Sequence, residues 1–183
     1  MDILKENERI DDLHRNNYVI IQDPKRFCFG IDAVLLSDFA KAKDGDIVFD
    51  IGTGTGIIPI LMSAKTNAKK YFAIDIQKES VDMAKRSVEI NNLSNKIEVF
   101  HLDVKNVFEK FEKNSVNVVT SNPPYMNIGG GIINEYDAKA IARHEIYCNL
   151  DDIVKTASML LKPKGKFYMV HRPNRLCDII CTL

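Results

Sequence analysis

The stretch from Ile47 to Gly56, with the sequence IVFDIGTGTG, decides the fold of this 183-residue chain. Its first half is a short apolar run typical of a buried strand. The three alternating glycines that follow predict a sharp turn whose backbone comes close to a ligand, where a Cβ atom would collide. A helix is expected from Gly56 to about Lys65. In an open α/β sheet, such a strand–turn–helix unit lies at the carboxyl edge of the sheet, where ligands bind.

Strands and helices alternate along the chain after this stretch. Further strands are predicted at 71–76, 96–101, 115–120 and 166–170, and further helices at 79–91, 104–111 and 151–161. This alternation predicts an α/β fold of the doubly wound, Rossmann-like type, with a mostly parallel sheet and right-handed crossovers.

The residues before the glycine-rich turn form a smaller N-terminal piece. Tyr18–Gln22 is predicted to be a strand, and Arg26–Phe29 to be the second arm of its hairpin. An apolar helix face is then expected at Ile31, Val34, Leu35 and Phe39. We therefore expect one structural domain, in which the hairpin and helix of residues 1–45 pack on a core formed by residues 46–183.

Composition excludes several classes of protein. The 25 basic and 25 acidic side chains balance, so no global charge favours nucleic acid, although a local basic patch is compatible with the sequence. No apolar run reaches the about 18 residues of a membrane span. Four cysteines lie apart without a CxxC pair, which favours reduced thiols in a cytoplasmic protein and no metal site: Cys28, Cys148, Cys177 and Cys181.

The glycine-rich turn predicts a nucleotide-like ligand, because an acidic residue, Asp75, ends the next strand, where it can accept hydrogen bonds from ribose hydroxyls. Ile57 stands where the dinucleotide fingerprint GxGxxG requires its last glycine, which disfavours an NAD-dependent oxidoreductase. The spacing GxGxG, with Asp50 two residues before the first glycine, resembles the first motif of class I S-adenosylmethionine (SAM)-dependent methyltransferases.

This resemblance implies SAM as the cofactor and a role for each residue of the turn. Asp50 and the backbone of Gly52, Gly54 and Gly56 would hold its methionine part, and Asp75 would hold its ribose. Asp103, at the end of the third strand, would face the adenine amino group. A helix N-cap is the alternative explanation for Asp103.

A second motif, Ser121-Asn122-Pro123-Pro124-Tyr125, follows the strand at 115–120 at the same edge. The prolines fix φ and remove two backbone donors, so the segment is stiff. The Asn122 side-chain oxygen and the Pro123 carbonyl would accept the two N–H bonds of a conjugated amino group and direct its lone pair at a methyl donor. Tyr125 would stack on the planar target.

Asn-Pro-Pro-Tyr resembles the fourth motif of amino-methyltransferases, which act on adenine N6 in nucleic acid or on a glutamine side-chain amide of protein release factors. The chain is most similar to the bacterial methyltransferases that modify N6 of the adenine beside the anticodon of valine tRNA. The residues that carry this similarity are 26–36, 142–145, 162–166 and 171–173. The resemblance implies tRNA as the partner, and no membrane.

Alternatives remain open at the level of function and of single residues. The target is a tRNA adenine or a protein glutamine amide, and a non-catalytic SAM- or RNA-binding module is a third alternative. Phe27 and Phe29 are expected in the hairpin core more than in base stacking. The Gly129–Gly131 loop is either a plain connection or a cover for the target base. A stretch without Asp or Glu either contacts phosphate groups of a nucleic acid or is simply exposed to solvent. Its basic residues are Lys162, Lys164, Lys166, Arg172 and Arg175.

The end of the chain carries one more expectation. Methyltransferases of this fold have seven strands, and the fifth predicted strand of the alternation is followed only by a helix that begins near Pro173. We therefore expect that the fold continues with about two more strands beyond residue 183.

Overall fold

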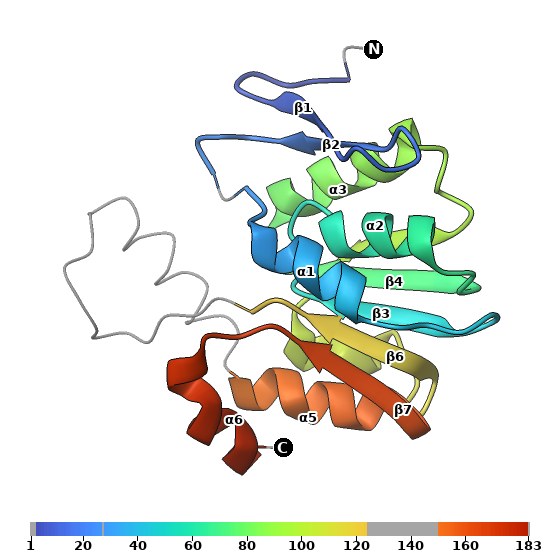
Figure 1. Ribbon diagram of the computed structural model, residues 1–183, viewed down its shortest axis with the longest axis vertical. Helices are drawn as coiled ribbons and strands as arrows, with labels where there is room; N and C mark the ends of the chain where they lie inside the picture. Colours follow the sequence, from blue (N-terminus) through green and yellow to red (C-terminus); the bar gives the residue numbers. More distant parts are fainter. Residues whose placement is uncertain (1–2, 27, 124–149, 183) are drawn as a thin grey trace.

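A five-stranded parallel sheet forms the centre of the protein, as seen in a computed structural model that describes residues 3–26, 28–123 and 150–182 (Figure 1). Its strand order is β5-β4-β3-β6-β7. The strands are β3 (Ile47–Ile51), β4 (Lys70–Asp75), β5 (Ile97–His101), β6 (Val116–Ser121) and β7 (Leu161–Met169). All four neighbouring pairs are parallel, so the predicted α/β fold with a parallel sheet is confirmed.

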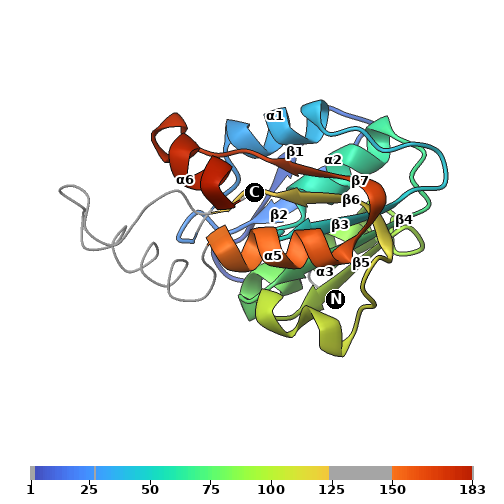
Figure 2. The ribbon, with the colours of Figure 1, turned by 90° about the horizontal axis from the view of Figure 1, so that it is seen from below.

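Helices cover both faces of the sheet. Helices α1 (Ile31–Phe39), α2 (Ile57–Lys65) and α3 (Lys78–Ile90) pack in one apolar core. The 3-10 helix η1 (Val104–Glu109) and helix α5 (Leu150–Leu160) pack in a second core on the opposite face. Figure 2 shows α1 and α2 on one side of the sheet and α5 on the other. The chain adds β4 and β5 on one side of β3 and then returns to add β6 and β7 on the other side. The connecting helices on the two sides therefore cover opposite faces of the sheet.

The second core is rich in aromatic side chains. The ring of Phe111 lies 4.9 Å from that of Phe49, 5.2 Å from Phe72 and 5.4 Å from Phe100, in edge-on or tilted geometry. Such pairs contribute about 0.5–1.5 kcal/mol each beyond the area that they bury. Phe111 therefore joins three neighbouring strands of the sheet from one side.

The N-terminal hairpin forms with a different partner strand from the predicted one. Strand β2 (Val19–Gln22) pairs antiparallel with β1 (Arg9–Asp12), which precedes it, so the prediction that Arg26–Phe29 is the second arm is wrong. The physical reason is a turn directly after β2. Asp23 accepts backbone hydrogen bonds from Lys25 and Arg26, and this leads the chain away from the strand.

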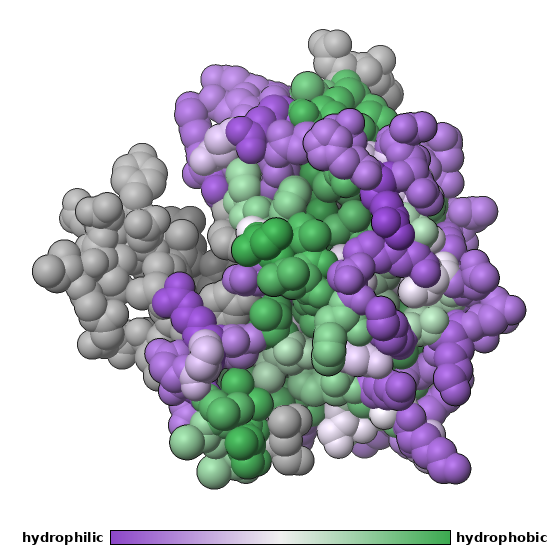
Figure 3. Space-filling view, in the orientation of Figure 1, coloured by the Kyte–Doolittle hydropathy of each residue, from purple (hydrophilic) through white to green (hydrophobic). Residues whose placement is uncertain are grey.

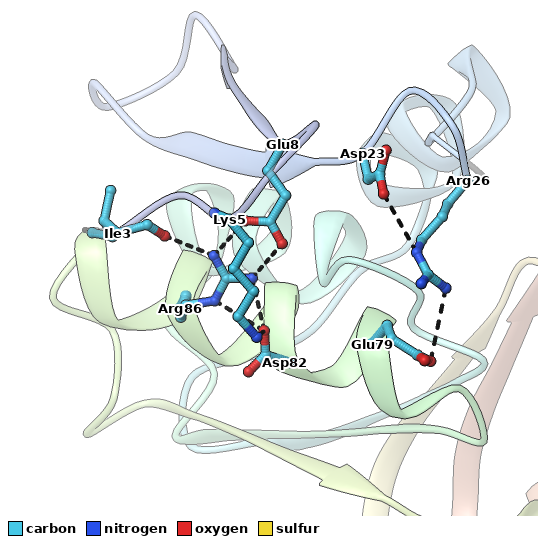
Figure 4. A network of polar contacts seen from close by, with 8 residues as sticks. All are labelled: Ile3, Lys5, Glu8, Asp23, Arg26, Glu79, Asp82 and Arg86. Atoms are coloured by element: carbon cyan, nitrogen blue, oxygen red, sulfur yellow. Dashed lines mark hydrogen bonds and ion pairs between the residues drawn. The ribbon is translucent and has the colours of Figure 1, made fainter. Parts of the chain in front are cut away.

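Polar side chains of α3 and of its C-cap residue Asn91 fasten this hairpin to the core. Asn91 donates to the Val19 carbonyl at 2.7 Å and accepts from the Val19 amide at 2.9 Å, while the Ser87 hydroxyl accepts from the Ile21 amide. Arg86 donates to both carboxylate oxygens of Glu8, at 2.6 and 2.7 Å (Figure 4). These contacts satisfy one edge of β2 in place of a third strand.

The predicted apolar face of helix α1 is only partly correct, because Val34 packs against the first core but the other three residues do not. Ile31, Leu35 and Phe39 are 66, 58 and 72% exposed, and the helix is buried instead at Ala33, Leu36 and Ser37. Ala33 and Ser37 are small, and α1 packs against α2. Helix α1 lies near the centre of the view in Figure 1, where Figure 3 shows an apolar surface in the same orientation.

The chain continues past the sheet in a short helical segment. The 3-10 turn η2 (Pro173–Arg175) leads into α6 (Leu176–Thr182), which packs on α5 and buries Ile179. Strands beyond residue 183 stay a prediction. Among the described residues, no helix is both long and apolar enough to cross a membrane.

Candidate functional site

The glycine-rich turn joins β3 to α2, and its three glycines have positive φ angles. These are +72° at Gly52, +56° at Gly54 and +88° at Gly56. A Cβ atom at Gly56 would lie 3.3 Å from the Cβ of Ala84, whereas one at Gly52 or Gly54 would point into open space. Gly56 therefore permits α2 and α3 to pack closely, and the first two glycines leave room beside the backbone for a ligand.

Asp75, at the end of β4, holds this turn in shape. Its carboxylate accepts a 2.8 Å hydrogen bond from the Gly54 amide and another from the Gln77 amide. The amides of Gly52 and Thr53 donate to the Ile74 carbonyl next to it. The side chain is 6% exposed. Asp75 thus organises the turn, a role that the sequence analysis did not anticipate, and its expected contact with ribose stays a prediction.

Asp50 is a buried carboxyl group below the turn, with 1% of its surface exposed. The Thr120 hydroxyl donates to its Oδ1 at 2.6 Å. Burial raises the pKa of Asp50 to about 7, against the opposing effect of hydrogen bonds from Thr120 and Thr53. Within the described residues, Asp50 Oδ2 and Thr53 Oγ1 are buried atoms without a hydrogen-bond partner of good geometry. They fit a ligand that brings its own donor, such as an ammonium group.

Asn122 lies beside the glycine-rich turn because β6 is the direct neighbour of β3. The register pairs Ser121 with Ile51, and the Ser121 hydroxyl donates to the Ile51 carbonyl at 2.9 Å. A small cavity of about 40 Å³ lies between Asn122, the turn and helix α1, and it is lined by Phe29, Ala33, Gly52, Thr53, Gly54, Thr55, Ile57, Ile58 and Asn122. The structure therefore brings the first motif and the start of the second together.

Other predicted residues lie farther from this point or outside the described residues. Pro123 is buried directly after Asn122, whereas Tyr125, the Gly129–Gly131 loop and residues 142–145 fall outside the described ranges. Asp103 caps η1 and accepts a 2.9 Å hydrogen bond from the Lys105 amide, as the alternative explanation expects. Asp103 still follows β5 at the carboxyl edge, and its contact with adenine stays a prediction.

The acid-free stretch does not form one patch. Lys162, Lys164 and Lys166 belong to the first two thirds of β7, while Arg172 and Arg175 follow its carboxyl end. The register of β7 shifts at its start, where Leu161 pairs with Val116 and Lys166 with Val118, while Met169 at its carboxyl end pairs with Ser121. The two arginines therefore lie at the edge that carries Asn122, and the first two lysines lie toward the opposite edge.

Two residues of the site were missed by the sequence analysis. Thr120 and Thr53 surround the Asp50 carboxyl group, and Thr120 is fully buried in β6. A buried threonine hydroxyl in an apolar strand such as Val118-Val119-Thr120 is the signal that could have revealed it.

The structure also bears on a second hollow and on metal binding. A larger hollow of about 290 Å³ between α3 and β5, lined by residues such as Lys85 and Glu98, contains none of the predicted site residues. In the part of the chain that the structure describes, no group of three or more His, Cys, Asp or Glu side chains could hold a metal ion.

Curated proteins match most of this chain. The chain is 27% identical over 150 residues to the tRNA1(Val) (adenine(37)-N6)-methyltransferase of Dyadobacter fermentans, a match covering 82% of this chain and 60% of the relative. It is 29% identical over 153 residues to the enzyme of the same name from Phocaeicola vulgatus, covering 84% and 63%. The chain thus spans about 60% of the length of these curated relatives.

Solved structures share the fold. The 16S rRNA N2 G1207 methyltransferase RsmC of Thermus thermophilus, solved with AdoMet and guanosine, aligns with a TM-score of 0.69 at 20% identity, over 93% of this chain and 43% of that one. TrmN from the same organism aligns with a TM-score of 0.61 at 22% identity, over 82% and 40%. The model of the methyltransferase small domain family matches residues 30–178, most of the chain. The protein therefore belongs to the methyltransferase small domain family.

Proposed function

We propose that this protein transfers a methyl group from SAM to the exocyclic N6 amino group of an adenine in the anticodon loop of tRNA. The names of its curated relatives point to valine tRNA. The observation that carries the proposal is the placement of Asn122 beside the Gly52–Thr55 backbone in one cavity. The names of the curated relatives support tRNA as the target. A tRNA target also implies that the reaction takes place in the cytoplasm.

The residues of the turn fit SAM on three grounds. Gly52 and Gly54 leave open space beside the backbone. Asp50 and Thr53 offer buried oxygen atoms without a hydrogen-bond partner of good geometry among the described residues, and these suit the ammonium group of the methionine part. Asp75 is a carboxylate at the end of β4, where ribose hydroxyls would reach it. When bound, SAM supplies a methyl group on a positively charged sulfur.

The protein's own contribution is to position the acceptor. An adenine amino group is a weak nucleophile, because its lone pair is delocalised into the ring. Hydrogen bonds from this group to the Asn122 side-chain oxygen and the Pro123 carbonyl would favour a tetrahedral nitrogen. Alignment and electrostatics of this kind lower the barrier without a strong general base. An adenine in an anticodon loop is largely unpaired, so turning it into a pocket costs little.

Methyl transfer from tritiated SAM tests the target. The substrates are an unmodified valine tRNA transcript, the same transcript with inosine in place of the adenine beside the anticodon, and a release factor. We expect label only in the adenine-containing tRNA, since inosine lacks the amino group. Label in the release factor alone would instead support the glutamine amide as target.

Asn122→Ala tests the chemistry. We expect a loss of transfer of at least about a hundredfold, the usual scale for a group that stabilises the transition state, while SAM binding measured by calorimetry stays nearly unchanged. Asn95→Ala is the matched control, because Asn95 is exposed before β5 at the opposite edge of the sheet. SAM binding without transfer to any substrate would support the non-catalytic alternative.

A further inference from the structure

One aromatic residue of the N-terminal piece lines the cavity of the site. Phe29 directly precedes Gly30, the N-cap of α1, and it lines the cavity together with Gly52, Gly54 and Asn122. It also packs against the first apolar core. The expectation that Phe29 belongs to the core of a hairpin is therefore incomplete, because the residue also lines the cavity where the two motifs meet.

A buried polar side chain fixes the backbone of this residue. Gln22, at the end of β2, is 2% exposed, and its Oε1 accepts a 2.8 Å hydrogen bond from the Phe29 amide. Its Nε2 donates to Asp11 Oδ2 across the hairpin. Asp11 in turn accepts from Arg9 at 3.0 Å. The hydrogen bonds that link Arg9, Asp11 and Gln22 thus hold the Gln22 side chain, which bridges the loop between β2 and α1 and fixes the backbone of Phe29.

We infer that Phe29 is a binding residue that favours the positively charged sulfur of SAM over a neutral sulfur, and that Gln22 is the positioning residue that holds it there. The inference rests on the proposed function. If the glycine-rich turn holds the methionine part and Asn122 holds the acceptor amine, the sulfur lies between them. Phe29 lines the cavity at this place.

The physical basis is the attraction between a cation and an aromatic ring. The face of a phenyl ring is negative, and a cation within about 6 Å of its centre gains more when both are shielded from water. S-adenosylhomocysteine, the product of methyl transfer, carries a neutral thioether at the same position. The ring should therefore contribute to the affinity for SAM and much less to the affinity for the product.

Calorimetric titration of both ligands tests the role of Phe29. For Phe29→Leu we expect the Kd of SAM to rise about threefold to tenfold more than the Kd of S-adenosylhomocysteine. Phe39→Leu is the matched control, because it makes the same change at the end of α1, at an exposed side chain outside the cavity. We expect an unchanged ratio for it. An equal loss for both ligands in Phe29→Leu would overturn the inference.

A donor–acceptor exchange tests Gln22. Gln22→Glu keeps an acceptor for the Phe29 amide but places two carboxylates together, so we expect it to lower the preference for SAM. Asp11→Asn alone should change it little, since its side-chain oxygen still accepts from Gln22. The double variant Gln22→Glu/Asp11→Asn restores a donor and an acceptor, and we expect it to restore the preference.

The outcomes separate the two levels of the argument. An unaltered preference in Gln22→Glu, or one that the double variant fails to restore, would overturn the positioning role. If the unaltered protein binds neither ligand, the proposed function fails, and this inference fails with it. If the unaltered protein binds SAM and Phe29→Leu shifts both ligands equally, the proposed function stands and only the inference is wrong.

Discussion

The carboxyl group of Asp50 is buried in the middle of the sheet, and only the Thr120 hydroxyl donates a hydrogen bond of good geometry to it among the described residues. Burial penalises the charged form, and this is the main reason why its pKa rises to about 7. In the unfolded chain the same carboxyl titrates near its ordinary value of about 3.9. Folding therefore takes up a proton between these two values.

This difference makes stability depend on pH in a defined direction. Between about pH 4 and 7 the folded state binds one proton more than the unfolded state, so the free energy of unfolding should fall as the pH rises. The slope from this group is at most about 1.4 kcal/mol per pH unit. Asp50→Asn should flatten it, which chemical denaturation at pH 5, 6, 7 and 8 would measure. An identical pH profile in both proteins would contradict the raised pKa.

The glycines of the turn should respond differently to alanine. Gly56→Ala meets Ala84 at 3.3 Å and has φ of +88°, so we expect it to destabilise the fold by about 2–3 kcal/mol. Gly54→Ala has φ of +56° and open space, so we expect only about 1 kcal/mol from backbone strain. Thermal unfolding would measure both. For each kcal/mol of stability lost, Gly54→Ala should nevertheless reduce the affinity for SAM more than Gly56→Ala does.

At the scale of elements, the N-terminal hairpin depends on α3. Arg86 connects Glu8 of the N-terminal segment with Asp82 one turn earlier on the helix, and Lys5 also contacts Asp82 (Figure 4). The Arg86 hydrogen bond is the main cause that lowers the pKa of Glu8, so this carboxylate stays charged in the fold. Since Glu8 has a side chain only 7% exposed, it depends on that partner.

Removing Arg86 should loosen the hairpin more than removing the pair. We expect Arg86→Met to destabilise the protein by about 1–3 kcal/mol, because it leaves Glu8 charged and poorly solvated. The double variant Arg86→Met/Glu8→Gln should recover part of this loss, as measured by a double-mutant cycle in urea. Since Glu8 stabilises only while ionised, its contribution should disappear as the pH falls through its lowered pKa. Additive effects of the two substitutions would contradict the pairing.

At the scale of the whole molecule, one sheet separates two cores. Strand β3 sends Val48 into the first core and Phe49 into the second, and β4 does the same with Tyr71 and Phe72. Alternate side chains of one strand point to opposite faces, so damage to one core reaches the other through the same backbone. The two halves should therefore unfold together.

Phe111→Leu tests this coupling. The substitution weakens the aromatic group on the second face, and we expect a loss of about 1–2 kcal/mol. Amides on the first face, such as those of Ile60 and Tyr71, should then exchange with solvent about 5–30 times faster if they open only by global unfolding. Hydrogen exchange with mass spectrometry would measure this. Faster exchange confined to η1 and α5 would show that the two cores open separately.

Much of this protein is determined by its sequence alone. Apolar strands alternate with helices in a pattern typical of a parallel sheet with helices on both faces, and the glycines at 52, 54 and 56 predict the turn that the structure shows. The motifs also predict the chemistry, because each combines a stiff backbone with specific polar groups. These features are local, so they can be read without the fold.

Other features were decided only by tertiary structure. The partner of β2, the buried face of α1 and the role of Asp75 in holding Gly54 all depend on contacts between residues far apart in the chain. The raised pKa of Asp50 depends on how many neighbours remove it from water, and the Phe29 amide finds its hydrogen-bond acceptor in Gln22 across a loop. Burial and long-range pairing are properties of the packed chain, and no local pattern encodes them.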